Sequence, residues 1–118
     1  MHHSRLQAPK MRTADGVEST PKLRAIYFDA LDWKGKPTKV FAWLGLPNNT
    51  QGKVPGVVLV HGGGGTAFKN WVQLWNNRGY AAISIAVEGQ IDRKPEGGSK
   101  KGGHWQQHPW AGPARQGI

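Results

Sequence analysis

VVLVHGGGGT, at residues 57–66, is an apolar run that ends in a histidine and four consecutive glycines. A nearly continuous apolar run, here from Gly56 to Val60, is typical of a strand that is buried on both faces. Each glycine loses more backbone freedom on folding than any other residue and adds no packing, so four in a row need a reason. We interpret them as a turn of bare backbone N–H groups that an oxyanion or a phosphate approaches closely.

The residues that follow the turn predict a βαβ unit. From Thr66 to about residue 78, apolar residues recur at spacings of three and four, which indicates a helix, and Gly79 is placed to end it. Residues 80–87 (YAAISIAV) then form a second apolar strand. A strand, a helix and a strand over about 30 residues predict a right-handed crossover that makes the two strands parallel.

The rest of the chain divides into a hairpin and two irregular segments. Residues 23–33 and 38–46 are rich in β-forming residues, and KGKP at residues 34–37 has turn chemistry, so they predict an antiparallel hairpin. Residues 1–22 are expected to form a flexible arm, and the Gly-, Pro- and Trp-rich residues 89–118 a long irregular loop. The fold class is therefore α/β, with a core at residues 23–88 in which the hairpin precedes the βαβ unit.

The composition limits the classes of function. The 118 residues allow one domain, and the absence of cysteine excludes disulfides and cysteine nucleophiles. The net charge is +9, but lysines and arginines are scattered, so we expect no nucleic-acid partner. There is no apolar run of the roughly 18 residues that cross a membrane, and residues 1–4 (MHHS) lack the apolar core of a signal peptide. We expect a soluble chain, cytoplasmic or secreted, with no membrane partner.

The glycine turn fits two kinds of site. Gly62-x-Gly64-x-x-Ala67 matches the tolerant form of the dinucleotide fingerprint, and Glu88 lies 21 residues after Ala67, at the end of the next strand. A bulky His61 at the strand end and a preceding hairpin are unusual in such a domain. The other interpretation is an oxyanion hole, which HGGG-type turns form after an early strand of α/β-hydrolases.

Several features together resemble the N-terminal part of bacterial acetyl xylan esterase-like and dienelactone hydrolase-like serine esterases. They are the leading hairpin, VLVHGGGGTAF at residues 58–68, NWVQLWNNRGY at residues 70–80, and a strand that runs into a long loop. The resemblance covers residues 24–118. It implies an α/β-hydrolase fold and serine-dependent hydrolysis of a small ester or sugar ester, without a cofactor.

The resemblance also implies roles for individual residues. A backbone N–H of Gly63 or Gly64 would hold the negative oxygen of the tetrahedral intermediate. His61 would position the turn by hydrogen bonding, without transferring a proton. The candidates for lining a substrate pocket beside the active-site mouth are His104, Trp105 and Trp110.

Neither a nucleophile nor a metal site is expected in the sequence. A G-x-S-x-G motif is missing, Ser84 lies inside an apolar strand, and Ser99 lacks the second glycine and a flanking strand. His104 and His108 have a spacing that could bind zinc on a helix, but the flanking glycines and proline disfavour a helix, so we expect no metal. We therefore expect an incomplete α/β-hydrolase sheet, the N-terminal portion of an esterase that ends before its nucleophile.

Overall fold

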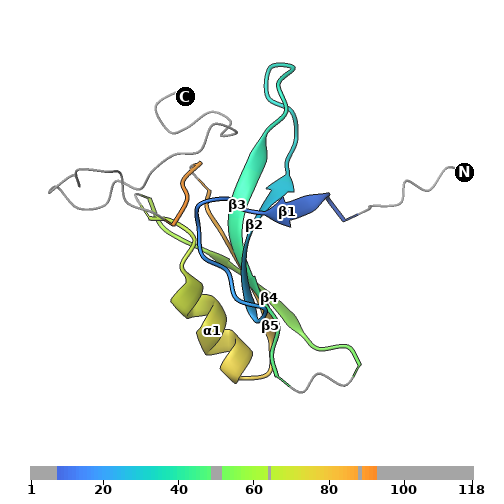
Figure 1. Cartoon of the computed structure of the whole chain (residues 1–118), viewed down its shortest axis with the longest axis vertical. Coiled ribbons are helices and arrows are strands. Elements are labelled where there is room, and N and C mark those ends of the chain that lie inside the picture. Colours follow the sequence, from blue (N-terminus) through green and yellow to red (C-terminus); the bar gives the residue numbers. More distant parts are fainter. Residues whose placement is uncertain (1–7, 49–51, 64, 88, 93–118) are drawn as a thin grey trace, which may run out of the picture.

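The computed structural model describes residues 8–48, 52–63, 65–87 and 89–92, which form a mixed α/β fold (Figure 1). Its elements are β1 (Met11–Thr13), β2 (Leu23–Asp29), β3 (Lys39–Gly45), β4 (Gly56–Val60), α1 (Lys69–Asn77) and β5 (Ala81–Ile85). The strands form one sheet in the order β1-β2-β3-β5-β4, and α1 packs against it. Among the described residues, no helix has the length and apolar character needed to cross a membrane.

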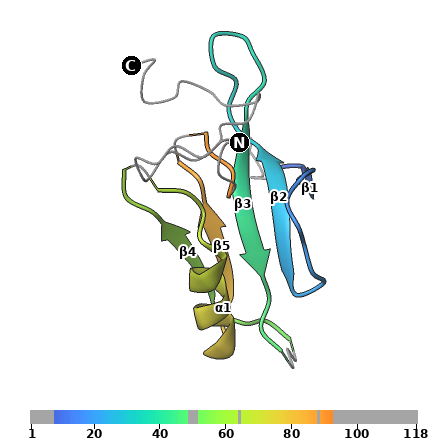
Figure 2. The ribbon, with the colours of Figure 1, turned by 60° about the vertical axis from the view of Figure 1, so that its left-hand side comes forward.

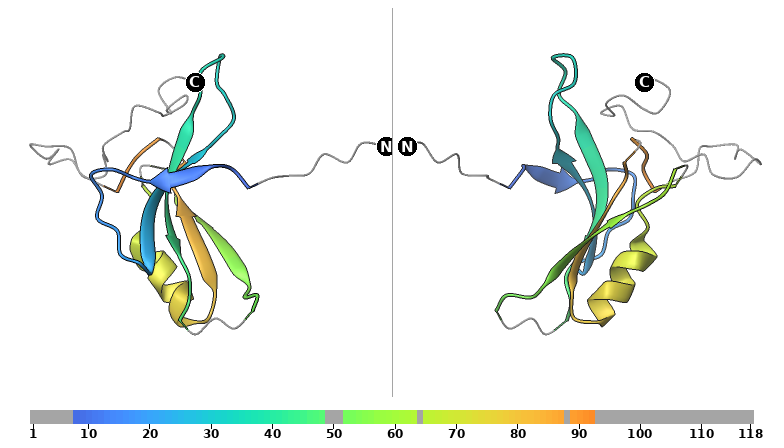
Figure 3. Two further views of the ribbon diagram at one scale, coloured as in Figure 1. Left: turned by 45° about the vertical axis from the view of Figure 1, so that its right-hand side comes forward. Right: turned by 180° about the vertical axis from the view of Figure 1, so that it is seen from behind.

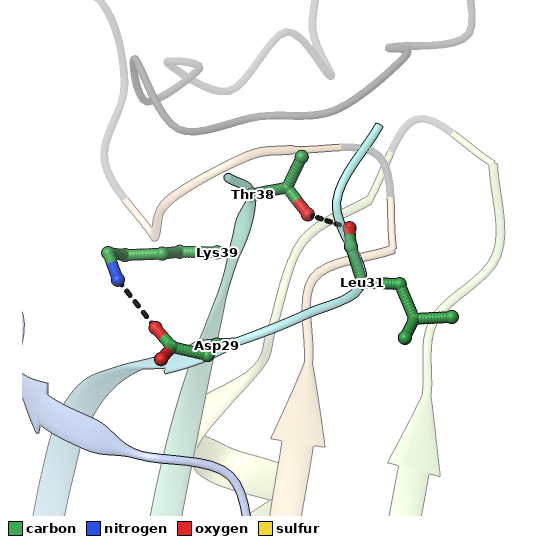
Figure 4. A network of polar contacts seen from close by, with 4 residues as sticks. All are labelled: Asp29, Leu31, Thr38 and Lys39. Atoms are coloured by element: carbon green, nitrogen blue, oxygen red, sulfur yellow. Dashed lines mark hydrogen bonds and ion pairs between the residues drawn. The ribbon is translucent and has the colours of Figure 1, made fainter. Parts of the chain in front are cut away.

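The predicted hairpin is confirmed. β2 and β3 pair antiparallel from Leu23 opposite Gly45 to Asp29 opposite Lys39. Two side-chain contacts join the end of β2 to the start of β3. The Lys39 ammonium donates to the Asp29 carboxylate at 2.5 Å, and the Thr38 hydroxyl donates to the Leu31 carbonyl at 2.7 Å (Figure 4). The hydrogen bond from Lys39 holds the pKa of Asp29 below its ordinary value.

The tip of the hairpin is a tight turn at Lys34 and Gly35. Both residues have positive φ angles, 49° and 75°, and Trp33 pairs with Lys36 across them. Positive φ at both central positions is the geometry of a type I′ turn, whose twist matches that of the adjoining strands. The turn predicted from KGKP is therefore confirmed, with Gly35 at the position where glycine is favoured.

The predicted βαβ unit is confirmed as well. β4 and β5 are parallel, from Gly56 opposite Ala81 to Val60 opposite Ile85, and α1 connects them. The helix spans Lys69–Asn77 and is shorter than the 66–78 predicted. Gly79 follows it with a φ of 88° and donates its N–H to the Asn76 carbonyl at 3.0 Å, so it ends the helix as expected.

The core lies between α1 and one face of the sheet (Figure 2). Val72 of the helix is fully buried, and it lies so close to β3 that a Cβ atom on Gly45 would come within 2.6 Å of its side chain. Phe41 makes edge-to-face contacts with Tyr27 and Trp43, both with ring centroids 5.9 Å apart. Only glycine at position 45 therefore allows the helix to approach the aromatic part of the sheet this closely.

The prediction that β4 is buried on both faces is wrong for this structure. Val58 and Val60 are 63% and 59% exposed, whereas Val57 and Leu59 pack against the core. β4 is an edge strand, and α1 covers one face of the sheet while no described element covers the other at β4 (Figure 3). The apolar run therefore reflected a strand with one buried face and one exposed apolar face.

The expected flexible arm is also corrected in part. Within residues 1–22, Met11–Thr13 form β1, which pairs antiparallel with β2, and Ala14 is buried in the core. The physical reason is that the free edge of β2 offers unpaired backbone groups that three extended residues can satisfy. A three-residue strand has no periodicity that a sequence pattern can reveal. Of the predicted loop at residues 89–118, only residues 89–92 lie in the described part.

Candidate functional site

The glycine turn, which we define as residues 61–66, leaves β4 at the carboxyl end of the parallel strands. Figure 2 shows that the segments after β4 and β5 and the tip of the hairpin lie at the same end of the sheet. Ligands of open α/β sheets bind outside the carboxyl ends of the strands. The turn therefore lies where this kind of fold places a binding site.

His61 is 5% exposed and uses both ring nitrogens to hold the turn. Nε2 accepts a hydrogen bond from the Val87 N–H at 2.9 Å, so this nitrogen carries no proton. Nδ1 then carries the proton and donates to the Gly62 carbonyl at 2.6 Å. Both ring nitrogens are engaged in this tautomer, and the ring connects the turn to the segment after β5.

Gly65 packs tightly against the histidine ring. Its N–H donates to the Gly62 carbonyl at 3.1 Å and closes the turn. A Cβ atom at this position would lie 3.0 Å from His61 Nδ1 and 3.2 Å from the Gly62 oxygen, tighter than ordinary contacts. The fourth glycine is thus explained by the packing of the turn on the histidine ring.

Gly62 and Gly63 are exposed, and the packing of the described chain does not explain the glycine at position 62. A Cβ atom on Gly62 would meet nothing within 4 Å, and neither residue has a positive φ. Within the described residues, no backbone hydrogen bond takes up the N–H of either glycine. Gly64, the other predicted donor, lies outside the described residues.

The end of the turn carries a buried hydroxyl. Thr66 is completely buried, and its Oγ1 has no hydrogen-bond partner among the described residues. Such a group costs about 1–3 kcal/mol of desolvation. Phe68, two residues later, donates its N–H to the Ser84 hydroxyl of β5 at 3.0 Å.

Asp92 is a feature of this end of the molecule that the sequence patterns did not indicate. Its carboxylate accepts a hydrogen bond from Trp43 Nε1 at 2.9 Å, and Lys69 Nζ lies 5.7 Å from the centre of the Trp43 ring. Burial raises the pKa of Asp92, while the Trp43 hydrogen bond and the Lys69 charge lower it in part. The contact ties the segment after β5 to β3 across 49 residues of sequence, so no local motif could have revealed it.

The other predicted site residues are not brought together by the described structure. The candidates for lining a substrate pocket, His104, Trp105 and Trp110, lie outside the described residues, as does Glu88. Among the described residues, no group of three His, Cys, Asp or Glu side chains could hold a metal ion. A hollow of about 480 Å³ lies on the sheet near Val40, Ile85 and Val87, and none of the described residues of the turn lines it.

The sequence as a whole matches one protein family. The model of the acetyl xylan esterase (AXE1) family matches residues 4–112, a range that includes the glycine turn, α1 and β5. No curated protein and no solved structure matches the sequence. The family match supports ester hydrolysis and gives no support to a dinucleotide-binding domain. The chain therefore belongs to the acetyl xylan esterase family, a family of ester hydrolases.

Proposed function

We propose that the glycine turn supplies a backbone donor of an oxyanion hole for the hydrolysis of acetyl or sugar esters. Attack on an ester carbonyl places negative charge on its oxygen, and preorganised N–H groups stabilise that charge. The observation that carries this proposal is the pair of exposed glycines, Gly62 and Gly63, whose N–H groups have no backbone partner in the described chain. Gly63 is the donor we favour, with Gly64 as the other candidate.

His61 contributes to this function as a positioning residue. Its two hydrogen bonds, to the Gly62 carbonyl and from the Val87 N–H, hold the first peptide of the turn. A donor stabilises a transition state best when it needs no reorganisation during the reaction. The buried ring therefore supports catalysis by holding the turn in place, without moving a proton.

The open space beside Gly62 agrees with this function. A Cβ atom there would meet nothing within 4 Å, whereas at Gly65 it would lie only 3.0 Å from His61 Nδ1. The glycine at position 62 leaves the backbone accessible to a ligand, which is the arrangement that close approach of an ester oxygen requires. The glycine at position 65 therefore allows the turn to pack on His61, and the glycine at position 62 allows a substrate to approach the backbone.

Titration of the ¹⁵N-labelled chain with methylphosphonate tests the proposal. This tetrahedral anion has the size of an acetyl transition state, and it is expected to shift the Gly62 and Gly63 amide signals saturably. Gly35 and Gly79, which lie in other turns, serve as internal controls, and chloride at equal ionic strength controls for the charge of +9. Equal shifts with chloride, or shifts no larger than those of the control glycines, would refute the proposal.

A substitution at the donor provides the second arm of the test. Gly63→Pro removes the N–H of residue 63 and should abolish the saturable shift at Gly62 while the signals of β2 and β3 remain unchanged. Where the turn acts together with a serine nucleophile, the same substitution is expected to lower kcat by about 10²–10³-fold. A folded Gly63→Pro variant with unchanged kcat would remove the catalytic role.

A further inference from the structure

We propose that Ser84 is a positioning residue for the glycine turn, a role that rests on the function proposed above. Ser84 lies in β5, between β3 and β4, where it pairs with Trp43 on one side and Leu59 on the other. Its side chain is completely buried in a strand whose other residues are apolar, AAISI. A buried hydroxyl in such a place is unfavourable unless it is hydrogen-bonded.

The partner of this hydroxyl is the start of the helix. Ser84 Oγ accepts a hydrogen bond from the Phe68 N–H at 3.0 Å. Phe68 is the N-cap of α1, and the helix has no side-chain cap of its own. The first N–H groups of a helix have no partner within it, and the Ser84 hydroxyl, from the neighbouring strand, accepts the N–H of the N-cap residue itself.

Together, His61 and Ser84 hold the two ends of residues 61–68, the segment that contains the glycine turn. At the first end, His61 Nε2 accepts the N–H of Val87, just beyond β5. At the second end, Phe68 donates to Ser84, three residues earlier along the same segment. Both anchors thus belong to β5 and its continuation, and the exposed Gly62 and Gly63 lie between His61 and Phe68 in the sequence.

The surroundings of Ser84 do not suit a nucleophile. Its oxygen is already an acceptor, and the side chain is fully buried, so it does not attack a substrate. Its effect reaches the reaction only through Phe68 and the turn. Functional backbone groups must be held within about 0.5 Å by supporting contacts, and Ser84 provides one of them.

The test compares Ser84→Ala with Ser19→Ala in the ¹⁵N-labelled chain. The Ser19 hydroxyl also accepts a backbone N–H, that of Ala25 at 2.8 Å, which makes it a matched control outside the turn. In Ser84→Ala, we expect Phe68 amide exchange to quicken and methylphosphonate affinity to fall, each by about two- to tenfold, the factor given by a hydrogen bond worth 0.5–1.5 kcal/mol. The Gly62 and Gly63 signals should shift too, and Ser19→Ala should leave all of these unchanged.

Two further variants separate positioning from general stability. Ser84→Thr keeps the Oγ acceptor and is expected to restore the Gly62 and Gly63 signals and the anion affinity. If Ser84→Ala fails to fold, Ser84→Cys takes its place, because the thiol has a similar volume and is only a weak acceptor.

The outcomes of the two proposals are distinguishable. Wild-type Gly62 and Gly63 signals in a folded Ser84→Ala or Ser84→Cys chain would overturn the positioning role, as would an equal response to Ser19→Ala. Absence of methylphosphonate binding to the unmodified chain would instead overturn the oxyanion function. The effect of Ser84→Ala on the turn signals would then still decide the positioning role.

Discussion

His61 Nε2 accepts the backbone N–H of Val87 at 2.9 Å and thereby joins the end of β4 to the segment after β5. The two residues are 26 positions apart and become neighbours because β4 and β5 are parallel. Parallel strands bring their carboxyl ends to the same edge of a sheet, so a side chain at one end can hold the backbone that leaves the other.

We expect His61→Ala to lower the free energy of unfolding by about 1–3 kcal/mol, because it leaves the Val87 N–H without its acceptor. Urea unfolding followed by tryptophan fluorescence measures the change. Leu31→Ala is the control, since Leu31 is 90% exposed and its truncation should change stability by less than about 0.5 kcal/mol. Equal stability of the two variants would contradict the anchoring role of His61.

The two glycines at the ends of the tetraglycine should respond differently to alanine. Gly65→Ala places a Cβ atom 3.0 Å from His61 Nδ1 and should destabilise the chain by about 1–3 kcal/mol. Gly62→Ala points into open space, so its effect on the free energy of unfolding should lie within about 1 kcal/mol of zero. Thermal unfolding of the two variants measures the difference in stability. If Gly62→Ala were less stable than Gly65→Ala, the tight packing of Gly65 on His61 would not be the reason for the glycine at position 65.

Asp92→Asn should raise stability slightly at neutral pH. Burial raises the pKa of Asp92, so the folded state binds the proton of this carboxyl more tightly than the unfolded state does. The free energy of unfolding therefore falls as the pH rises from the ordinary pKa of aspartate to the raised pKa of Asp92. Asparagine keeps an acceptor for Trp43 Nε1 without a charge to bury. The higher stability of Asp92→Asn relative to the unmodified chain should disappear below about pH 4, where the aspartate is protonated in both the folded and the unfolded state.

Unfolding experiments on Asp92→Asn and the unmodified chain across this pH range measure the effect. Asp29→Asn is the comparison, because the pKa of Asp29 is lowered by its hydrogen bond from Lys39 and its pH dependence has the opposite sign. A gain from Asp92→Asn that persists unchanged at pH 3 would show that charge burial is not the cause.

The 118-residue chain is expected to hydrolyse no ester above the background of free histidine. In the described part, the Ser19 and Ser84 hydroxyls each accept a backbone N–H, and both nitrogens of His61 are engaged. A covalent mechanism needs a nucleophile within reach of a base. Assays with p-nitrophenyl acetate and a serine-directed phosphonate measure this, and saturable turnover lost on labelling one serine would show that a nucleophile is present.

The exposed face of β4 should limit solubility. Val58 and Val60 are exposed on an edge strand whose sequence, GVVLV, contains neither a charge nor a proline. Such edges promote association between chains. Val58→Lys is expected to reduce aggregation, measured by light scattering, with little change in the unfolding midpoint. Val57→Lys is the contrasting variant, because Val57 packs against the core and its replacement should destabilise the fold.

The sequence by itself determined the local elements and the place of the candidate site. The hairpin, the βαβ unit and the stop of α1 at Gly79 are encoded in patterns of a few residues, because alternation, helical spacing and glycine at positive φ act over short distances. His61 and the glycines were recognisable for the same reason, as a turn between a strand and a helix. The acetyl xylan esterase resemblance was likewise carried by contiguous motifs.

Only the tertiary structure decided how these elements meet. It placed β5 between β3 and β4, which leaves β4 at the edge and makes Ser84 the partner of Phe68. It also brought Asp92 to Trp43 and paired Met11–Thr13 with β2. These contacts join residues far apart in the chain. They form because unpaired backbone groups and exposed apolar surface of one element are satisfied by another element, so a local sequence pattern does not predict them.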